Sequence, residues 1–362
     1  MPSTWSNVTH IFGWFSFFVT IWSTISLCFL IEKRSRKEFG NYKNFMRIYC
    51  FYALSFGIID WLVQPIAVVD INGFGYVFYS ENRLFDLGYS ASHLIQILYC
   101  GCFIASSSFL SLNFIYRYVS SCHKYHMSLF QGWYLLLWFM YCAVPFFVWS
   151  VMVYFIMSPT PERTAHFNQS TVLLEGVDIT ESAYVGITCY HVSNTSDYVY
   201  GDIEWSTMSA LLGLIGFQGF FYGTSLFCGV QTYRENLTLF RASHLSQKLY
   251  KIQAQLFRAI VIQATIPLVS VYVPAAIMIT GSMFGFYVGR IGPWVVMSIS
   301  IYPPLDTFVF LLSIRDYRDA LFCNSANTYP PSGNSSVHPV TRPGTAIAKA
   351  SDIPPQPIEM VA

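Results

Sequence analysis

The chain has 362 residues, of which 54% are hydrophobic and only 11% are charged, and its formal net charge is +1. Soluble proteins carry about 25% charged residues, so this composition excludes an ordinary soluble domain and indicates a membrane protein. A net charge so close to zero also argues against nucleic acid as the main partner. The first residues show neither a basic leader nor a small-residue cleavage site, so we expect the first membrane span to direct insertion.

Apolar runs long enough to cross a bilayer recur seven times along the chain. A helix rises about 1.5 Å per residue, so about 20 apolar residues cross a hydrocarbon core of about 30 Å. The sequence therefore predicts an all-α membrane protein, a bundle of seven transmembrane helices. The spans are expected at residues 11–31, 45–69, 91–118, 133–157, 205–232, 256–279 and 291–314.

Positive charges are distributed unevenly between the two sides of this bundle. Of the 20 Lys and Arg residues, 17 fall in the connections and the tail on one side. Only Arg83, Arg163 and Arg290 fall on the other side. Because Lys and Arg gather in cytoplasmic segments, the N-terminus is expected outside the cell and the C-terminus inside.

This topology divides the chain into three parts. Residues 1–10 are the expected extracellular N-terminus, and residues 11–322 are the expected bundle, including a short helix along the membrane at residues 316–322. Beyond it, the composition changes to Pro, Ser, Asn and Thr with few apolar side chains. Such a segment cannot bury a core, so residues 323–362 are expected to form a disordered cytoplasmic tail.

Two kinds of modification site occur on the expected outer side. Asn-x-Ser/Thr sequons, at which we expect glycan, begin at Asn7, Asn168 and Asn194. The long outer loop, residues 158–204, also contains Cys189, and extracellular thiols often form disulfides. The nearest partners are Cys100 and Cys102 of the third span, which point to nearly opposite helix faces. A Cys100–Cys189 disulfide and a free Cys189 are the two alternatives.

Two carboxylates lie inside the predicted spans, where an ionisable group is costly. They are Asp60 in the second span and Asp306 in the seventh. Their depths, counted from the basic flanks, differ by about one helical turn, so we expect both to enter one polar cluster in the bundle. The cluster is either a structural hydrogen-bond site or a switch or ion site.

Prolines interrupt the two last spans. The four that we single out are Pro267, Pro274, Pro303 and Pro304. A proline inside a helix removes one backbone hydrogen bond and can kink or loosen it. These positions are therefore either hinges or static kinks that shape the bundle.

The third span contains no Asp, Glu, Lys or Arg from Ala91 to Tyr116 and then reaches Arg117. Arg117 is either an anchor to lipid phosphates or a switch cation between helix ends. Tyr99 lies at a depth where a ligand-facing residue is expected, and Gln96 and Tyr272 are assigned to the same pocket. Because the third span has no acid near Tyr99, an amine-binding salt bridge is not expected there.

Five motifs in order along the chain resemble those of a known receptor family. They are Gly40-Asn41-Tyr42, Phe114-Ile115-Tyr116-Arg117-Tyr118, Gln255-Leu256-Phe257-Arg258-Ala259-Ile260 with Gln263 and Ile266-Pro267, Tyr302-Pro303-Pro304-Leu305-Asp306, and Ile314-Arg315-Asp316-Tyr317-Arg318. With them, the chain resembles nematode chemoreceptors of the Str superfamily, with its Str and Srj types, over about residues 40–322. Members often carry proline after the seventh-span aspartate, where this chain has Thr307.

The resemblance implies a bundle of the G-protein-coupled receptor type and an olfactory or other chemosensory role. It implies three partners: an external small-molecule ligand, a heterotrimeric G protein and membrane lipids. The implied location is the plasma membrane, at the sensory cilia of chemosensory neurons. Coupling to the G protein is assigned to Arg117, Tyr116, Tyr118 and Arg258.

A ligand-gated channel or transporter with seven helices is the alternative function. That class favours more charge inside the membrane, or two halves with matching broken helices, and the sequence shows neither. The spans also contain no nucleophile paired with a base and no His-Glu-x-x-His pattern. We therefore expect no enzymatic activity, metal or cofactor.

Overall fold

The computed structural model describes residues 4–34, 42–80, 88–191, 202–241, 254–255, 257–258, 261–262, 264–313 and 315–322, and residues 1–323 form one compact unit. Within these ranges, seven helices are long and apolar enough to cross a membrane, which confirms the predicted fold class. The predicted glycosylation site Asn194 and the tail, residues 323–362, lie outside the described residues.

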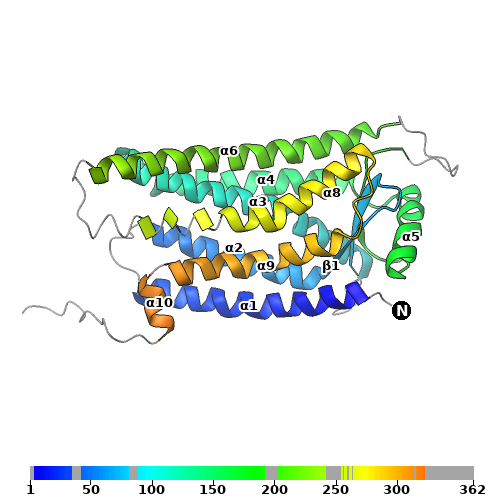
Figure 1. The fold of residues 1–362 in the computed structure, drawn as a ribbon, viewed down its shortest axis with the longest axis horizontal. Coiled ribbons are helices and arrows are strands. Elements are labelled where there is room, and N and C mark those ends of the chain that lie inside the picture. Colours follow the sequence, from blue (N-terminus) through cyan, green and yellow to red (C-terminus); the bar gives the residue numbers. More distant parts are fainter. Residues whose placement is uncertain are drawn as a thin grey trace, which may run out of the picture. The chain divides into compact units, whose positions relative to one another are not determined.

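The spanning helices lie alongside one another (Figure 1). They are α1 (Thr4–Arg34), α2 (Tyr42–Val63), α3 (Gly88–Cys122), α4 (Tyr134–Ile156), α6 (Trp205–Arg241), η3 (Leu268–Tyr272) continued by α8 (Val273–Phe284), and α9 (Gly292–Ser313). A short helix, η2 (Lys124–Phe130), follows α3, and the short helix expected after the last span is α10 (Arg315–Leu321). α1 begins seven residues before the predicted first span.

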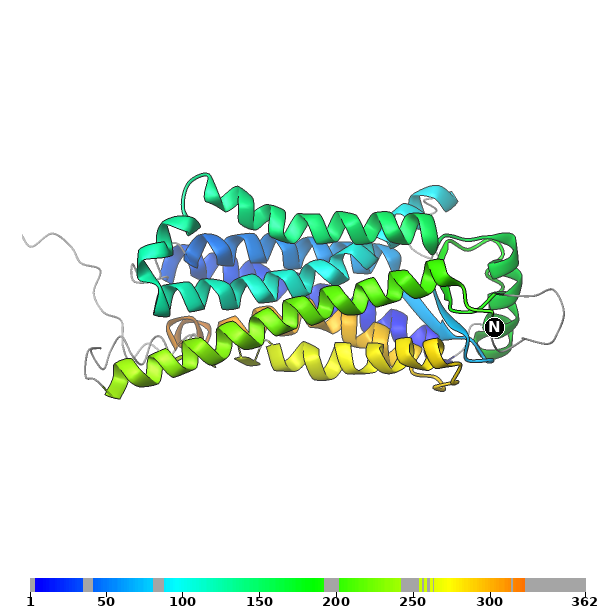
Figure 2. The same ribbon diagram turned by 90° about the horizontal axis from the view of Figure 1, so that it is seen from above.

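The bundle is organised around α3. In the most apolar part of α3, 67% of the residues are buried, compared with 28% in α4. α3 packs against α6, α4 and α2, and α1 packs against α9 and α2; Figure 2 shows α6 running along α3. α4 is apolar over most of its circumference and leaves large side chains exposed, as expected of a helix that faces lipid.

A small sheet and a helix cover the end of the bundle where α1 begins (Figure 1). The antiparallel strands, in the order β1-β2-β3, are β1 (Pro65–Val69), β2 (Gly75–Ser80) and β3 (Tyr184–Thr188), and the helix is α5 (Pro161–Glu175). We call these four elements the lid. The lid adds a small three-stranded sheet to a fold whose membrane-spanning part is entirely helical.

The lid also corrects two predicted boundaries. The predicted second span, residues 45–69, is too long, because α2 ends at Val63 and Gln64 adopts a positive φ of 45°. Pro65 then begins β1, whose five residues are all buried. A short buried strand has the same continuous apolar pattern as a helix end, so the pattern did not separate them. The long outer loop, residues 158–204, likewise contains α5 and β3.

The chain around α5 has clear start and stop signals. Thr160 precedes the helix, and its hydroxyl accepts a hydrogen bond from Arg163 N at 3.3 Å. Pro161 occupies the first turn, where a missing N–H costs nothing. The helix ends at Gly176, which has a φ of 70°. Local sequence alone therefore favours this helix.

The lid has its own small core. The Phe167 ring is fully buried between α5 and the sheet. A Cβ atom at Gly186 would lie 2.6 Å from Phe167 Cε2, so a side chain larger than hydrogen does not fit there. At Gly75, a Cβ atom would lie 2.1 Å from Ile187 O on the neighbouring strand. The two glycines allow the sheet and α5 to approach closely.

Candidate functional site

A hydrogen-bonded cluster joins α3, α6 and η3. The Tyr272 hydroxyl lies 2.9 Å from Ser106 Oγ and 2.6 Å from Ser107 Oγ. Ser107 Oγ in turn donates to Gln218 Oε1 at 2.6 Å. The Tyr222 ring packs edge-on against Tyr272, with centroids 5.0 Å apart. One tyrosine on the sixth span is therefore connected to the third and fifth spans through polar groups.

Tyr272 is the last residue of a π-helical turn. η3 follows Pro267 directly, and Pro274 occupies the first turn of α8. A π-helical turn is a single-turn insertion that is found in α-helices mostly at functional sites. The prolines of the sixth span therefore flank an irregular turn, as expected of a loosened helix. Their role as a hinge stays a prediction.

In α9, helical structure continues through Pro303 and Pro304. Pro304 has no N–H to donate to Ser300 O, four residues earlier. The hydroxyl of Ser16 on α1 donates to Ser300 O instead. The proline therefore frees a carbonyl that binds the neighbouring helix.

Thr307, where members of the Str superfamily often have proline, has a similar role. Its hydroxyl lies 2.9 Å from Pro304 O and 3.3 Å from Pro303 O. It also lies 2.6 Å from Ser23 Oγ on α1. Thr307 is fully buried at this α1–α9 contact. A threonine here thus takes part in polar contacts that proline would not make.

The two intramembrane carboxylates accept from different hydroxyl groups in the contacts described, and a polar cluster that contains both stays a prediction. Asp60 Oδ1 accepts a hydrogen bond from Ser300 Oγ at 3.0 Å. Asp306 Oδ2 accepts from Tyr49 and Tyr302. Both aspartates are 5% exposed. Ser300 and Asp306 are six residues apart on α9, or about 9 Å along its axis, so each carboxylate has its own set of hydroxyl donors.

The residues assigned to the ligand pocket lie at two depths. Gln96 Nε2 donates to Phe78 O of β2 at 2.5 Å, so Gln96 lies directly under the lid. The Tyr99 ring lies 6.0 Å from the Phe56 ring of α2. Tyr272 contacts Ser106, ten residues further along α3 from Gln96, which is about 15 Å. Gln96 and Tyr99 are therefore close in depth, and Tyr272 is deeper.

The residues assigned to G-protein coupling differ in exposure. The Arg117 side chain is buried, with the guanidinium carbon 5.9 Å from the centroid of the Tyr116 ring. The ring of Tyr116 packs against Phe45 of α2 and Phe130 of η2, at 5.2 and 5.1 Å.

The other two coupling residues lie nearer the surface. The Tyr118 hydroxyl is 3.0 Å from His123 Nε2, and its ring lies 6.1 Å from the ring of Phe227 on α6. Arg258, among the described residues before the sixth span, is exposed. Tyr116 and Arg117 are thus core residues, whereas Arg258 is accessible to a partner.

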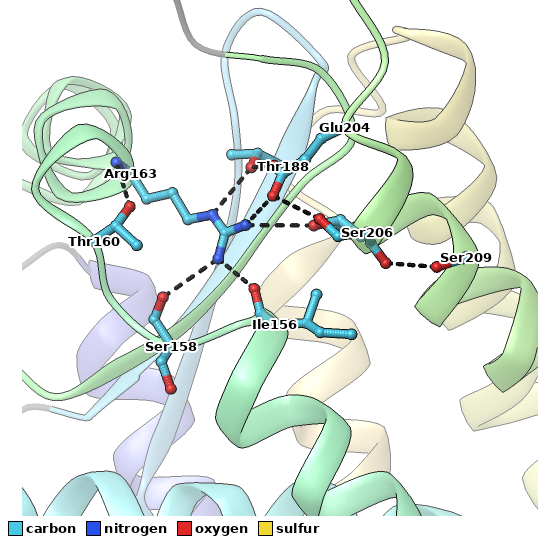
Figure 3. A network of polar contacts seen from close by, with 9 residues as sticks. Ile156, Ser158, Thr160, Arg163, Thr188, Glu204, Ser206 and Ser209 are labelled. Carbon is cyan, nitrogen blue, oxygen red and sulfur yellow. Dashed lines mark hydrogen bonds and ion pairs between the residues drawn. The ribbon is translucent and has the colours of Figure 1, made fainter.

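Arg163 is the centre of a polar network between the lid and the bundle (Figure 3), and sequence reasoning missed this network. It lies on α5 and was counted only as one of three basic residues on the outer side. Its N–H groups are donated to Thr188 Oγ1 at 3.3 Å, Ser158 O at 3.3 Å, Thr207 Oγ1 at 3.4 Å, Ile156 O and Glu204 Oε1. One buried guanidinium therefore joins α4, α5, β3 and α6.

A second ion pair holds α5 to the hairpin between β1 and β2. Asp70 Oδ2 lies 3.2 Å from His166 Nε2, and Asp70 Oδ1 accepts from Ser170 Oγ at 2.8 Å. The Asp70 side chain is fully buried. Burial raises the pKa of this carboxyl, but the hydrogen bonds from His166, Ser170 and the backbone of Phe74, together with the His166 charge, hold the pKa below its ordinary value.

The cysteines and asparagines predicted as modification sites on the outer side have different surroundings. Cys100 and Cys189 are both free thiols, so the disulfide alternative is not realised in the structure. Burial raises the pKa of the Cys189 thiol to about 12, which makes it unreactive at neutral pH. Asn7 is exposed, whereas Asn168 Oδ1 accepts a hydrogen bond from Ile179 N at 3.0 Å.

The seven spans and the polar contacts among them define a serpentine membrane protein of the receptor type. The family model described as "Serpentine type 7TM GPCR chemoreceptor Str" matches residues 9–322, and the chain belongs to this family. This confirms the resemblance found in the sequence.

Curated relatives agree with the family assignment. The chain is 27% identical over 313 residues to the serpentine receptor class r-10 of Caenorhabditis briggsae, which covers 84% of this chain and 87% of that protein. It is 26% identical over 334 residues to the Caenorhabditis elegans protein of the same name, covering 88% and 92%. It is 25% identical over 308 residues to the G-protein coupled receptor str-33 of Caenorhabditis elegans, covering 85% and 88%.

Proposed function

We propose that this chemoreceptor-family protein binds an external small molecule beneath the lid and activates a heterotrimeric G protein at the opposite end. The positive-inside rule supports this orientation, with the N-terminus and the lid outside the cell. It also supports a plasma-membrane location with glycan at Asn7, Asn168 or Asn194. By family membership, the location within the cell is the sensory cilium of a chemosensory neuron.

The observation that carries the proposal is a pair of buried polar groups under the lid. The Tyr99 hydroxyl and Gln96 Oε1 make no hydrogen bond with the described residues. Gln96 is fully buried, and Tyr99 is 3% exposed. A buried polar group without a partner costs about 1–3 kcal/mol, so such groups call for a ligand or water. Gln96 and Tyr99 are three residues apart on α3, so the two groups lie on the same face of that helix.

These two groups define the chemistry of the ligand. Gln96 already donates its amide N–H to Phe78 O, so its Oε1 offers an acceptor. The Tyr99 hydroxyl can donate. A small neutral molecule with a hydroxyl or amide group satisfies both, because it donates to Gln96 and accepts from Tyr99. The apolar rest of the molecule packs against the aromatic residues nearby, such as Phe56.

The Tyr272 cluster supplies the path from the ligand to the other end of the bundle. Its members on α3, Ser106 and Ser107, lie between Gln96 and Arg117, about 15 Å from each along the helix axis. The irregular turn of η3, flanked by Pro267 and Pro274, can change its hydrogen-bond pattern at this point. A ligand that shifts α3 against the sixth span would alter these contacts and change the surroundings of Arg117.

A ligand screen with paired variants tests the proposal. Cells that express the receptor are exposed to a panel of small alcohols, amides, ketones and esters, with a calcium or cyclic-nucleotide reporter. Tyr99→Phe is expected to raise the half-maximal concentration of an active alcohol or amide about tenfold, which corresponds to one lost hydrogen bond. Thermal stability without ligand should stay equal or rise, because the removed hydroxyl has no partner.

Tyr141→Phe is the matched control. Its hydroxyl lies 2.9 Å from Ser111 Oγ, so its removal costs stability without touching the proposed pocket. We expect lower thermal stability and an unchanged half-maximal concentration. Equal potency of every active ligand on Tyr99→Phe and wild type would contradict the proposed pocket.

A further inference from the structure

Two cysteines on neighbouring helices form a site that the proposed function does not use. Cys28 lies on α1 and Cys50 on α2, and the two thiol side chains interact with one another. Cys50 is 1% exposed, whereas Cys28 is exposed at the bundle surface. One thiol is therefore accessible from the bilayer, and its partner is buried directly behind it.

The register of the two antiparallel helices independently brings these thiols together. Nearer the lid, the Phe17 ring stacks on the Trp61 ring with centroids 4.5 Å apart. Nearer the opposite end, Glu32 forms an ion pair of 2.6 Å with Arg47. In an antiparallel pair one residue number rises as the other falls, so the residue opposite Cys28 is close to position 50.

The two helices also pack closely on the face of α2 that carries Cys50. A Cβ atom at Gly57 would lie 2.9 Å from Thr20 Cγ2, so α2 approaches α1 closely there. Gly57 and Cys50 are seven residues apart and share one face of α2. A disulfide needs Cα atoms within about 7 Å and side chains that point toward each other. The register of the two helices places the thiols opposite one another, and their interaction agrees with side chains that point toward each other.

We propose that Cys28 and Cys50 form a reversible disulfide when a hydroperoxide reaches the lipid-exposed thiol. The Cys28 sulfur attacks the peroxide and the O–O bond breaks. Cys28 becomes a sulfenic acid, and the thiol proton leaves with the alcohol or water. The Cys50 sulfur then attacks the Cys28 sulfur and the S–O bond breaks, which releases water that takes up the Cys50 proton. The two thiols lose two electrons, and the peroxide gains them.

The expected consequence is a covalent link between α1 and α2 near the ion pair of Glu32. Reduction by a cytosolic dithiol restores both thiols and makes the link reversible. The site is a modification site for oxidants in the bilayer, such as lipid hydroperoxides. It does not depend on the identity of the chemosensory ligand.

The test uses the full-length receptor in membranes of expressing cells. The membranes are treated with tert-butyl hydroperoxide, remaining thiols are blocked with N-ethylmaleimide, and the protein is then reduced. A mass-tagged maleimide counts the thiols released by reduction. We expect two tags per chain in the wild type, and a linked peptide that contains both Cys28 and Cys50.

Variants separate this pair from the other cysteines. Cys28→Ser, at an exposed position, should fold and lose both tags. Cys50→Ala should give no linked peptide and at most one tag, from a Cys28 sulfenic acid that reduction returns to the thiol. Cys142→Ser, which removes a buried thiol on α4, should keep both. Absence of tags in the wild type would overturn the proposal, as would tags that persist in Cys28→Ser. A Cys28 sulfenic or sulfonic acid without a linked peptide would also overturn it.

Discussion

The two ends of the bundle are held together by different chemistry. At the lid end, the buried Arg163 of α5 donates hydrogen bonds to β3, α4 and α6 and to Glu204, and Asp70 pairs with His166. At the opposite end, the ion pairs described, such as Glu32–Arg47, are at the surface, and rings pack in the interior: Tyr116 packs on Phe130, which stacks on Trp138 at 4.7 Å. Charged hydrogen bonds fix direction and distance, whereas apolar packing is not directional.

This difference assigns different roles to the two ends. A network in which each donor has one acceptor allows one arrangement, so the lid end determines whether the receptor folds. Ring packing around Tyr116 is not directional, so the rings can rearrange more readily than a network of charged hydrogen bonds. We therefore propose that the end that contains Arg117 is suited to two arrangements and controls signalling.

The largest expected effect is on Arg163. Arg163→Met would leave Glu204, whose side chain is only 16% exposed, without its cation, and breaking a buried ion pair typically costs about 3–5 kcal/mol. We expect a strong loss of surface expression and a lower melting temperature of the protein in detergent. Arg290→Met is the control, because Arg290 is also on the lid side but is exposed, with one bond of 3.5 Å to Leu174 O. Similar losses of surface expression and melting temperature in both variants would contradict the central role of Arg163 at the lid end.

Asp70 provides the next test. Asp70→Asn should cost about 1–3 kcal/mol, because charged hydrogen bonds to α5 are weakened. The pKa of Asp70 is below its ordinary value in the folded state, so its stabilisation is present above the unfolded pKa of about 4 and is lost as the pH falls through the lower folded value.

Hydrogen exchange measures this pH dependence. Amides of α5 should stay protected from neutral pH down to about pH 4 and lose protection below it. In Asp70→Asn, protection should be lower at neutral pH and change less on acidification. Loss of wild-type protection already near pH 6 would show that another group controls the lid.

Much of the fold follows from the sequence, because seven long apolar runs have few alternatives in a chain with 11% charge. The lid was not predicted, since Pro65–Val69 is as apolar as the helix before it. Arg163 gave no signal beyond its charge, and its role depends on Thr188 and Glu204, which are distant in sequence. The hydroxyl groups that Asp60 and Asp306 accept from belong to other residues of α2 and α9, and residue depth alone does not determine these contacts.

The smallest expected effect concerns the carbonyl freed by Pro304. Ser16→Ala removes the hydroxyl that donates to Ser300 O and should cost about 1 kcal/mol. In a Pro304→Ala background, residue 304 regains an N–H for the same carbonyl, so Ser16→Ala should cost less. A double-mutant cycle of melting temperatures measures the coupling between Ser16 and Pro304. Equal costs in both backgrounds would contradict this account of the α1–α9 contact.

The measurement that tests the division of roles most directly is the maximal response of Arg117→Lys at saturating ligand. Arg117 is 4% exposed, a burial that fits a switch cation better than a headgroup anchor. Lysine keeps the charge but cannot reproduce the planar, multiply donating guanidinium. We expect Arg117→Lys to reach the surface at wild-type levels and to give a much smaller maximal response. An unchanged maximal response at matched surface expression would contradict the account.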